Sequence, residues 1–292
     1  MGRVATVNQI IPFSCVDGPG SRLVIFLQGC NFNCKNCHNP YTIDMCDSCG
    51  DCVATCPTSA LSLTHNAQGK PKVVWDSELC THCDTCLSTC PRQSSPKTRQ
   101  YSVPQMLELI RKQVHFINGI TVSGGEATLQ LPFIIELFKA IKTSADLAHL
   151  SCMIDSNGYV SEGGWQQVMP YLDGAMIDLK SWQEHTHRYI TGRDNHRVFS
   201  SLKLLVAADK LYEIRLLYIP KISDIDTEVN AIAGYLTQLP ASVRVKLNAF
   251  QHHGVTGEAR QWETCSEEKM LELAARLTER GVANLILPNV YL

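Results

Sequence analysis

Short apolar runs recur along the chain and are separated by segments in which apolar and polar positions alternate. Runs of this kind favour strands that are buried on both faces of a parallel sheet. We expect strands at residues 22–27, 119–122, 150–154, 175–179, 212–218, 243–247 and 285–287.

Between these strands, apolar side chains recur at the spacing of one helix face. The pattern predicts helices at residues 103–116, 132–142 and 266–280. The last of these begins at a serine cap and ends before Gly281. Strands that alternate with helices predict an α/β fold with a parallel sheet, either open or closed as a barrel.

Cysteine is the residue type that composition singles out. The 292 residues include 14 cysteines, most of them between residues 30 and 90. The chain opens without an apolar signal segment and has no apolar run of ~18 residues. We therefore expect a cytoplasmic protein whose reduced thiols bind metal. The net charge of −2 predicts no general attraction to nucleic acid or to an anionic membrane.

Residues 44–96 carry the run C-x2-C-x2-C-x3-C-P twice, as bacterial ferredoxins do. In ferredoxins the fourth cysteine of each run binds the other cluster. The spacing therefore assigns Cys46, Cys49, Cys52 and Cys90 to one [4Fe–4S] cluster and Cys80, Cys83, Cys86 and Cys56 to the other. Two zinc sites are the alternative, which the density of thiols disfavours. Residues 92–100 are expected to be a polar linker.

The segment before this insert has three cysteines, Cys30, Cys34 and Cys37, at C-x3-C-x2-C spacing and no fourth nearby. Three thiolates can hold three irons of a [4Fe–4S] cluster, which leaves the fourth iron open for a chelating ligand. A zinc or redox site that borrows a cysteine from the insert is the alternative. The motif follows the strand at 22–27, at the sheet edge where ligand sites of α/β folds collect.

Polar clusters follow the other strands as well. They are SGGEA at 123–127, DSNG at 155–158, DLK at 178–180, Arg215 within EIRLLYIP, and KLNAFQHHG at 246–254. Each alone is explained by a turn or a helix cap. Their shared position at strand ends predicts that they line one mouth.

Together these motifs resemble the radical S-adenosylmethionine (SAM) enzymes, and among them the glycyl-radical-enzyme activating enzymes, the family of the pyruvate formate-lyase activase. The resemblance runs from FSCVDGPGSRLVIFLQGC through CHNP, SGGEA, DSNG and DLK. It implies a partial parallel (β/α)6 barrel, formed by residues 1–43 and 97–292. A ferredoxin-like insert at 44–96, outside the mouth of the barrel, marks a subgroup.

The implied activity is that of an anaerobic oxidoreductase. It cleaves SAM reductively and removes a Cα hydrogen from a glycine of a partner glycyl radical enzyme. Three [4Fe–4S] clusters and a flavodoxin or ferredoxin as electron donor are implied. We expect a monomer that binds neither nucleic acid nor membrane.

The resemblance also implies residue roles. Cys30, Cys34 and Cys37 hold the catalytic cluster, Asn36 and His38 lie at the adenine, and Gly124, Gly125 and Glu126 face the methionyl amino group. Asp178 and Lys180 face the methionyl and ribose end of SAM, and Asn157 and Arg215 also belong to the cofactor site. Asp155, Ser156, Asp178 and the Met176 carbonyl match a monovalent-cation site, and Asp17 contacts the partner's glycine loop.

Two positions depart from the family's pattern. Asn36 stands where an aromatic residue is usual, and either Gln251 or His252 takes the place of a SAM-contacting histidine. Two other functions remain open. A radical SAM enzyme could act on a small molecule or another peptide, and a three-cluster electron-transfer protein would have no SAM chemistry.

Overall fold

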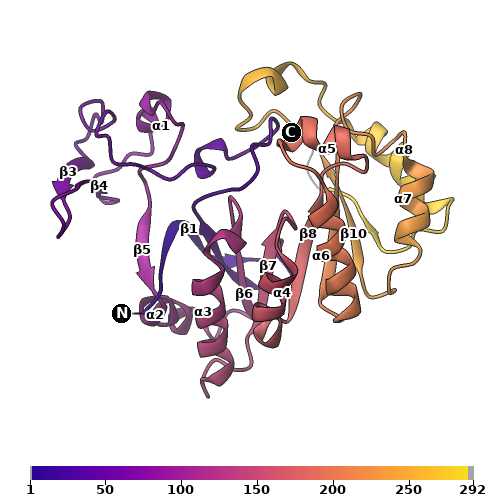
Figure 1. The fold of residues 1–292 in the computed structure, drawn as a ribbon, viewed down its shortest axis with the longest axis horizontal. Helices are drawn as coiled ribbons and strands as arrows, with labels where there is room; N and C mark the ends of the chain where they lie inside the picture. Colours follow the sequence, from indigo (N-terminus) through magenta and orange to yellow (C-terminus); the bar gives the residue numbers. More distant parts are fainter. Residues whose placement is uncertain (1, 289–292) are drawn as a thin grey trace.

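The computed structural model describes residues 2–288, and its frame is a nine-stranded sheet of order β11-β10-β9-β8-β7-β6-β2-β1-β5 (Figure 1). The parallel strands are β2 (Arg22–Leu27), β6 (Gly119–Gly124), β7 (Ser151–Ser156), β8 (Gly174–Leu179), β9 (Leu211–Tyr218), β10 (Arg244–Ala249) and β11 (Leu285–Ile286). The α/β fold with a mostly parallel sheet is therefore confirmed, and its six longer parallel strands, β2 and β6–β10, are those expected from the sequence.

Two antiparallel strands at one edge were not expected. β1 (Val4–Ser14) pairs with β2, and β5 (Arg99–Ser102) pairs with β1. Apolar and polar residues alternate only in part along β1, whose pairing with β2 has two register shifts. β5 is short and polar, as is typical of an edge strand.

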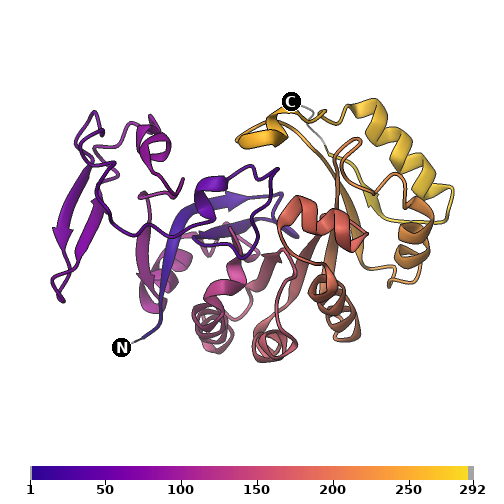
Figure 2. The ribbon, with the colours of Figure 1, turned by 45° about the horizontal axis from the view of Figure 1, so that its top comes forward.

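The helices cover the outer face of the sheet (Figures 1 and 2), except the one at Glu184–Thr191, which packs against the loop of the first cysteine motif, where Asn33 N donates to Thr191 O and Lys35 N to Ile190 O, both at 2.9 Å. They are α2 (Val103–Gln113), α3 (Leu131–Thr143), α4 (Glu162–Val168), α5 (Glu184–Thr191), α6 (His196–Ala207), α7 (Val229–Leu236) and α8 (Glu267–Thr278). Short 3-10 helices lie at Pro40–Thr42, Ala127–Gln130, Met169–Tyr171 and Gly257–Gln261. The serine cap of α8 is confirmed, since Lys269 N donates to Ser266 Oγ at 3.3 Å. Within residues 2–288, none of the helices combines the length and apolar character needed to cross a membrane.

The insert lies beyond the β1–β5 edge (Figure 1). It contains a hairpin of β3 (Leu61–His65) and β4 (Pro71–Trp75), the helix α1 (Thr85–Thr89), and a small core that includes Cys52 and Cys86.

The segment expected to be a linker is packed instead. Ser94 and Ser95 are each 1% exposed. Ser94 Oγ donates to Asp44 O at 2.8 Å, and Ser95 N donates to Tyr41 O at 3.0 Å. Small hydroxyl side chains can thus be buried here because the backbone of the preceding loop satisfies them.

A buried arginine braces the sheet at the amino ends of its parallel strands. Arg22 donates to Thr121 Oγ1 at 2.7 Å, to Pro19 O at 3.1 Å and to Ser151 O at 3.0 Å. Burial lowers its pKa to about 10, so the guanidinium stays charged at neutral pH. These bonds hold the β1–β2 turn, which contains Asp17, against the amino ends of β2 and β6.

Candidate functional site

A cavity of about 480 Å³, partly open to solvent, lies at the carboxyl ends of the parallel strands. Its polar lining includes Cys30, Cys34, Asn36, Cys37, His38, Ser123, Gly124, Gly125, Asp155, Ser156, Asn157, Asp178, Lys180, Arg215 and Asn248. The structure thus brings together most of the residues singled out in the sequence. Their roles as ligands stay predictions.

The two glycines after β6 allow the cysteine loop to lie close to that strand. Gly124 has a φ of +132°, and a Cβ there would lie 2.1 Å from Leu27 O. A Cβ on Gly125 would lie 2.4 Å from Gly29 O. The backbone of β6 could not approach the loop this closely with any larger residue.

The three thiols of the first motif line the cavity from one side. Burial raises the pKa of Cys30 and of Cys34 to about 12 and also raises that of Cys37. The ammonium of Lys180 opposes this rise at all three thiols. Buried thiolates need compensating positive charge, which iron ions and Lys180 would supply, so the residues present fit a thiolate-bound cluster. Among residues 2–288, no three His, Cys, Asp or Glu side chains lie close enough to hold one metal ion, whereas a [4Fe–4S] cluster binds each thiolate through a different iron.

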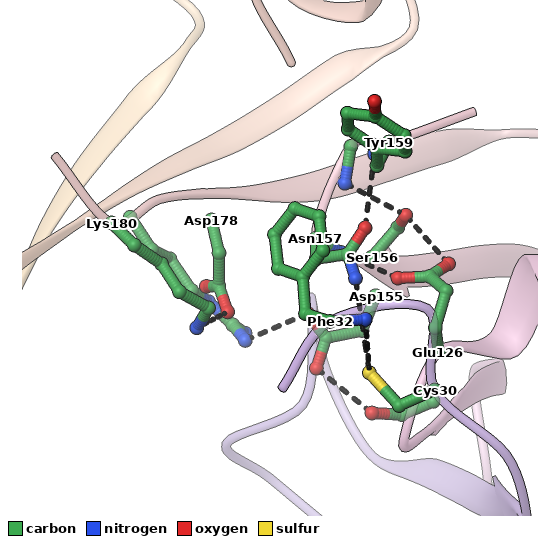
Figure 3. Close-up of polar contacts among 12 residues, drawn as sticks. Cys30, Phe32, Glu126, Asp155, Ser156, Asn157, Tyr159, Asp178 and Lys180 are labelled. Atoms are coloured by element: carbon green, nitrogen blue, oxygen red, sulfur yellow. Dashed lines mark hydrogen bonds and ion pairs between the residues drawn. The ribbon is translucent and has the colours of Figure 1, made fainter. Parts of the chain in front are cut away.

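Strand register explains why acidic and basic side chains meet on the other side of the cavity. Asp155 on β7 is paired with Met176 on β8, and Asp178 on β8 is paired with Arg215 on β9. Arg215 Nη1 donates to Asp155 Oδ1 at 2.9 Å, and Lys180 Nζ donates to Asp178 Oδ2 at 2.9 Å. Figure 3 shows the Asp178–Lys180 pair across the cavity from Cys30.

Burial and these contacts together shift the pKa values of the two carboxyl groups in opposite directions. Burial raises the pKa of Asp155, and Arg215 opposes that rise. Burial alone would also raise the pKa of Asp178, but Lys180 and Arg215 hold it below its usual value. Asp178 is therefore ionised more readily than Asp155 and is the better of the two carboxylates for binding a positively charged group.

A buried acceptor without a partner also faces this cavity. The Oδ1 atom of Asn36 has no hydrogen-bond partner among the described residues. Because an unpaired buried oxygen is costly, a ligand with an N–H donor would be bound favourably here.

Comparisons with known proteins agree with this geometry. The profile of the Radical SAM superfamily matches residues 24–230. The chain belongs to the radical SAM superfamily. It is 31% identical to the "Benzylsuccinate synthase activating enzyme" of Thauera aromatica, across 96% of this chain and 92% of that protein. It is 29% identical to the "(2S)-3-sulfopropanediol dehydratase activating enzyme" of Klebsiella oxytoca, across 85% and 82%.

Solved structures support the fold. QueE from Escherichia coli superposes with a TM-score of 0.54 over 98% of this chain and 94% of that one, at 13% identity. The chain is therefore an enzyme related to activating enzymes rather than a pure electron carrier, and its superfamily implies a [4Fe–4S] cluster and SAM.

In this radical SAM enzyme, Glu126 does not line the cavity. It is 1% exposed and lies below the β7 turn (Figure 3). Its carboxylate accepts from Thr128 N at 3.0 Å, Thr128 Oγ1 at 2.6 Å, Ser156 Oγ at 2.8 Å and Asn157 N at 2.7 Å. Glu126 thus braces the turn that presents Ser156 and Asn157, and the contact with SAM implied by the resemblance stays a prediction.

The Gln251–His252 pair also lies outside the cavity lining. Gln251 Nε2 donates to Cys265 O at 2.9 Å, and His252 Nε2 lies 2.8 Å from Trp262 O. The backbone of this segment still reaches the cysteine loop, since a Cβ on Gly254 would lie 1.9 Å from His38 O. A SAM contact by either side chain stays a prediction.

Arg215 occupies part of the predicted monovalent-cation site. Besides Asp155, its guanidinium contacts Glu213 Oε1 at 2.7 Å and Met176 Sδ at 3.1 Å. The positive charge next to Asp155 is therefore already supplied by the chain, and the cation stays a prediction.

Some cavity residues were missed from the sequence. Ser123 Oγ donates to Asp155 Oδ2 at 3.0 Å, and Phe32 and Leu217 supply apolar wall. Ser123 and Asn248 lie within the quoted strand-end segments, which was the only available signal. The apolar residues were indistinguishable from core positions.

Proposed function

We propose that this protein is a radical SAM activase that places a radical on a glycine of a partner glycyl radical enzyme. The similarity along nearly the whole chain to two proteins named as activating enzymes carries the proposal. When bound at Cys30, Cys34 and Cys37, a [4Fe–4S] cluster supplies the one electron that splits SAM into methionine and a 5′-deoxyadenosyl radical. That radical takes one hydrogen atom from the glycine Cα, which gives 5′-deoxyadenosine and the glycyl radical.

The residues of the chain bind and orient the reactants. Asn36 Oδ1 can accept from the adenine amino group, and Asp178 can bind the positively charged methionyl amine. Lys180 offsets the negative charge of the three thiolates. The hydrogen moves as an atom, so no side chain has to act as acid or base.

Partner recognition is proposed for the turn between β1 and β2. Asp17 lies there, and Phe13 and Val16 beside it are 55% and 70% exposed. Asp17 is also within electrostatic reach of Asp155 in the cavity. A glycine loop that enters from this side would meet an acidic residue flanked by apolar surface.

The insert is proposed to bind two [4Fe–4S] clusters, for about twelve irons in all. Cys56, Cys80, Cys83 and Cys86 line one hollow together. This grouping supports the exchange of the fourth cysteine between the runs. Burial raises the pKa of Cys52, a thiol of the other proposed cluster, to about 11.

The test uses reconstituted protein, SAM, a one-electron reductant and a candidate partner glycyl radical enzyme, under anaerobic conditions. We expect a glycyl radical in the electron paramagnetic resonance (EPR) spectrum and stoichiometric 5′-deoxyadenosine. A partner with its radical glycine changed to Ala is the matched control and should give neither. If SAM is cleaved equally with both partners and no protein radical forms, the alternative of a small molecule or another peptide is favoured.

A further inference from the structure

One lysine lies between the insert and the first cysteine motif. Lys97 lines the hollow formed by Cys56, Cys80, Cys83 and Cys86. It also lines a second groove, which it shares with Tyr41, Ser95 and Asp84. No role in SAM cleavage accounts for a cation at this position.

The lysine is held in place by its surroundings. Its side chain is 16% exposed and forms an ion pair with Asp84, whose side chain is 57% exposed. The two preceding serines anchor its backbone, since they bond to the carbonyls of Asp44 and Tyr41. The ammonium is thus fixed beside the thiols rather than extended into solvent.

Tyr41 connects this hollow to the catalytic motif. It lies four residues after Cys37 in sequence and lines the same groove as Lys97 and Asp84. Cys80 and Cys86 in turn line the same hollow as Lys97. Tyr41 and Lys97 therefore share one groove, and Lys97 also shares the hollow of the Cys56–Cys80–Cys83–Cys86 group, which places the two residues between that group and the segment that follows Cys37.

We propose that Lys97 raises the reduction potential of the cluster held by Cys56, Cys80, Cys83 and Cys86, and that this cluster passes electrons to the first motif. This inference rests on the proposed two-cluster insert. A low-potential flavodoxin or ferredoxin loses one electron, the insert cluster gains it, and the same electron then moves to the cluster at the first motif.

The physical basis is the charge of the reduced cluster. A cluster with four thiolate ligands is anionic, and one added electron makes it more so. A fixed ammonium nearby stabilises the reduced form more than the oxidised form. Asp84 cancels part of this effect, but its exposure means that solvent screens it more strongly than Lys97.

Two variants with opposite expected signs test the inference. The full-length chain is reconstituted in a Cys34→Ala background to remove the first-motif signal, and the insert clusters are titrated by EPR. Lys97→Gln should disfavour reduction of one insert cluster about tenfold, which is ~59 mV for a one-electron couple. Asp84→Asn should shift the same cluster in the opposite direction, and Lys97→Arg should leave it near the wild-type value.

A matched control is Lys72→Gln, on the hairpin strand β4 of the same insert but outside the hollow, which should shift neither cluster. If both insert clusters are present and Lys97→Gln moves neither potential, the inference is overturned. If iron analysis finds no insert clusters, the proposed two-cluster function of the insert is wrong and the inference about Lys97 fails as well. That result is known before any potential is measured.

The order of transfer has its own test. In a chain with an intact first motif, freeze-quench EPR follows reduction of that cluster by a protein donor. Cys83→Ser should stop this reduction, because the cluster next to Tyr41 is lost. If Cys49→Ser stops it and Cys83→Ser does not, the assigned order is wrong.

Discussion

Replacement of Glu126 by Gln distinguishes a brace from a SAM ligand. In the wild type, one carboxylate oxygen accepts from Thr128 N, Thr128 Oγ1 and Ser156 Oγ, and the other accepts from Asn157 N. The carboxamide of Gln keeps one acceptor oxygen but places an NH2 group where the second oxygen was, so that NH2 faces an N–H or O–H donor. The variant therefore loses one charge-assisted bond and leaves one buried donor unpaired.

The magnitude follows from these contacts. A bond to a charged group contributes about 1.5–3 kcal/mol, and relief of the buried charge offsets part of its loss. We expect Glu126→Gln to destabilise the protein by about 2 kcal/mol, a fall in Tm of about 4–8 °C. Glu126→Ala loses all four bonds and should cost about 4 kcal/mol.

The assay pairs thermal unfolding with SAM binding by calorimetry, both on anaerobically reconstituted protein. Because Glu126 lies outside the cavity lining, SAM affinity of the Gln variant should change less than about threefold when measured well below its Tm. Glu108→Gln, on the exposed side of α2, is the control and should shift stability by less than about 0.5 kcal/mol. An unchanged Tm with SAM affinity lowered tenfold or more would refute the brace and restore a direct contact.

Other predictions concern the catalytic motif and its surroundings. Changing the three cysteines of the first motif to Ala should lower the iron content from about twelve to about eight per chain and abolish 5′-deoxyadenosine formation; stoichiometric zinc in the wild type would contradict the cluster assignment. Gly125→Ala should displace the cysteine loop and reduce cluster occupancy there, measured by iron and sulfide analysis, whereas Gly163→Ala, with open space around it, should be neutral or stabilising. Asn36→Ala should weaken SAM binding about tenfold but barely affect a 6-oxopurine analogue, which lacks the amino donor; equal losses for both ligands would exclude the adenine contact. Asp17→Asn should lower glycyl radical yield while partner-independent SAM cleavage stays unchanged, and a parallel loss of both would place Asp17 in the cavity's own chemistry.

The strands were predictable because parallel strands covered on both faces must be apolar along their length. Both ends of each expected strand lie within two residues of the ends of an observed strand, and β2 matches at both ends. α5 gave no such signal, since its sequence EHTHRYIT is mostly polar and buries His187 as well as Ile190. β5 has a polar sequence and therefore gave no strand signal. Its partner β1 contributes the buried side chains of this pair.

The location of the site at one edge of the sheet could be predicted from the sequence. The hydrogen-bond partners of its side chains could not. Parallel strands carry all their carboxyl ends to one edge, so motifs that follow strands must converge there. Whether a side chain points to a ligand or to the protein depends on neighbours distant in sequence. Glu126 meets donors from the next strand, and Gln251 meets a carbonyl from residue 265. No local pattern encodes such partners.

The packed segment before β5 bears on why the insert exists. A flexible linker would let the insert move relative to the barrel, and electron transfer between clusters would then vary with each orientation. Here Ser94 and Ser95 are buried against the loop that follows the first motif, and the Arg99 guanidinium lies 5.4 Å from the Trp75 ring of the insert. The first contact joins the insert to the loop after the catalytic motif, and the second joins it to the edge strand β5. Fixed geometry is needed for an electron relay and is unnecessary for a tether, so these contacts favour the proposed relay over a flexibly tethered insert.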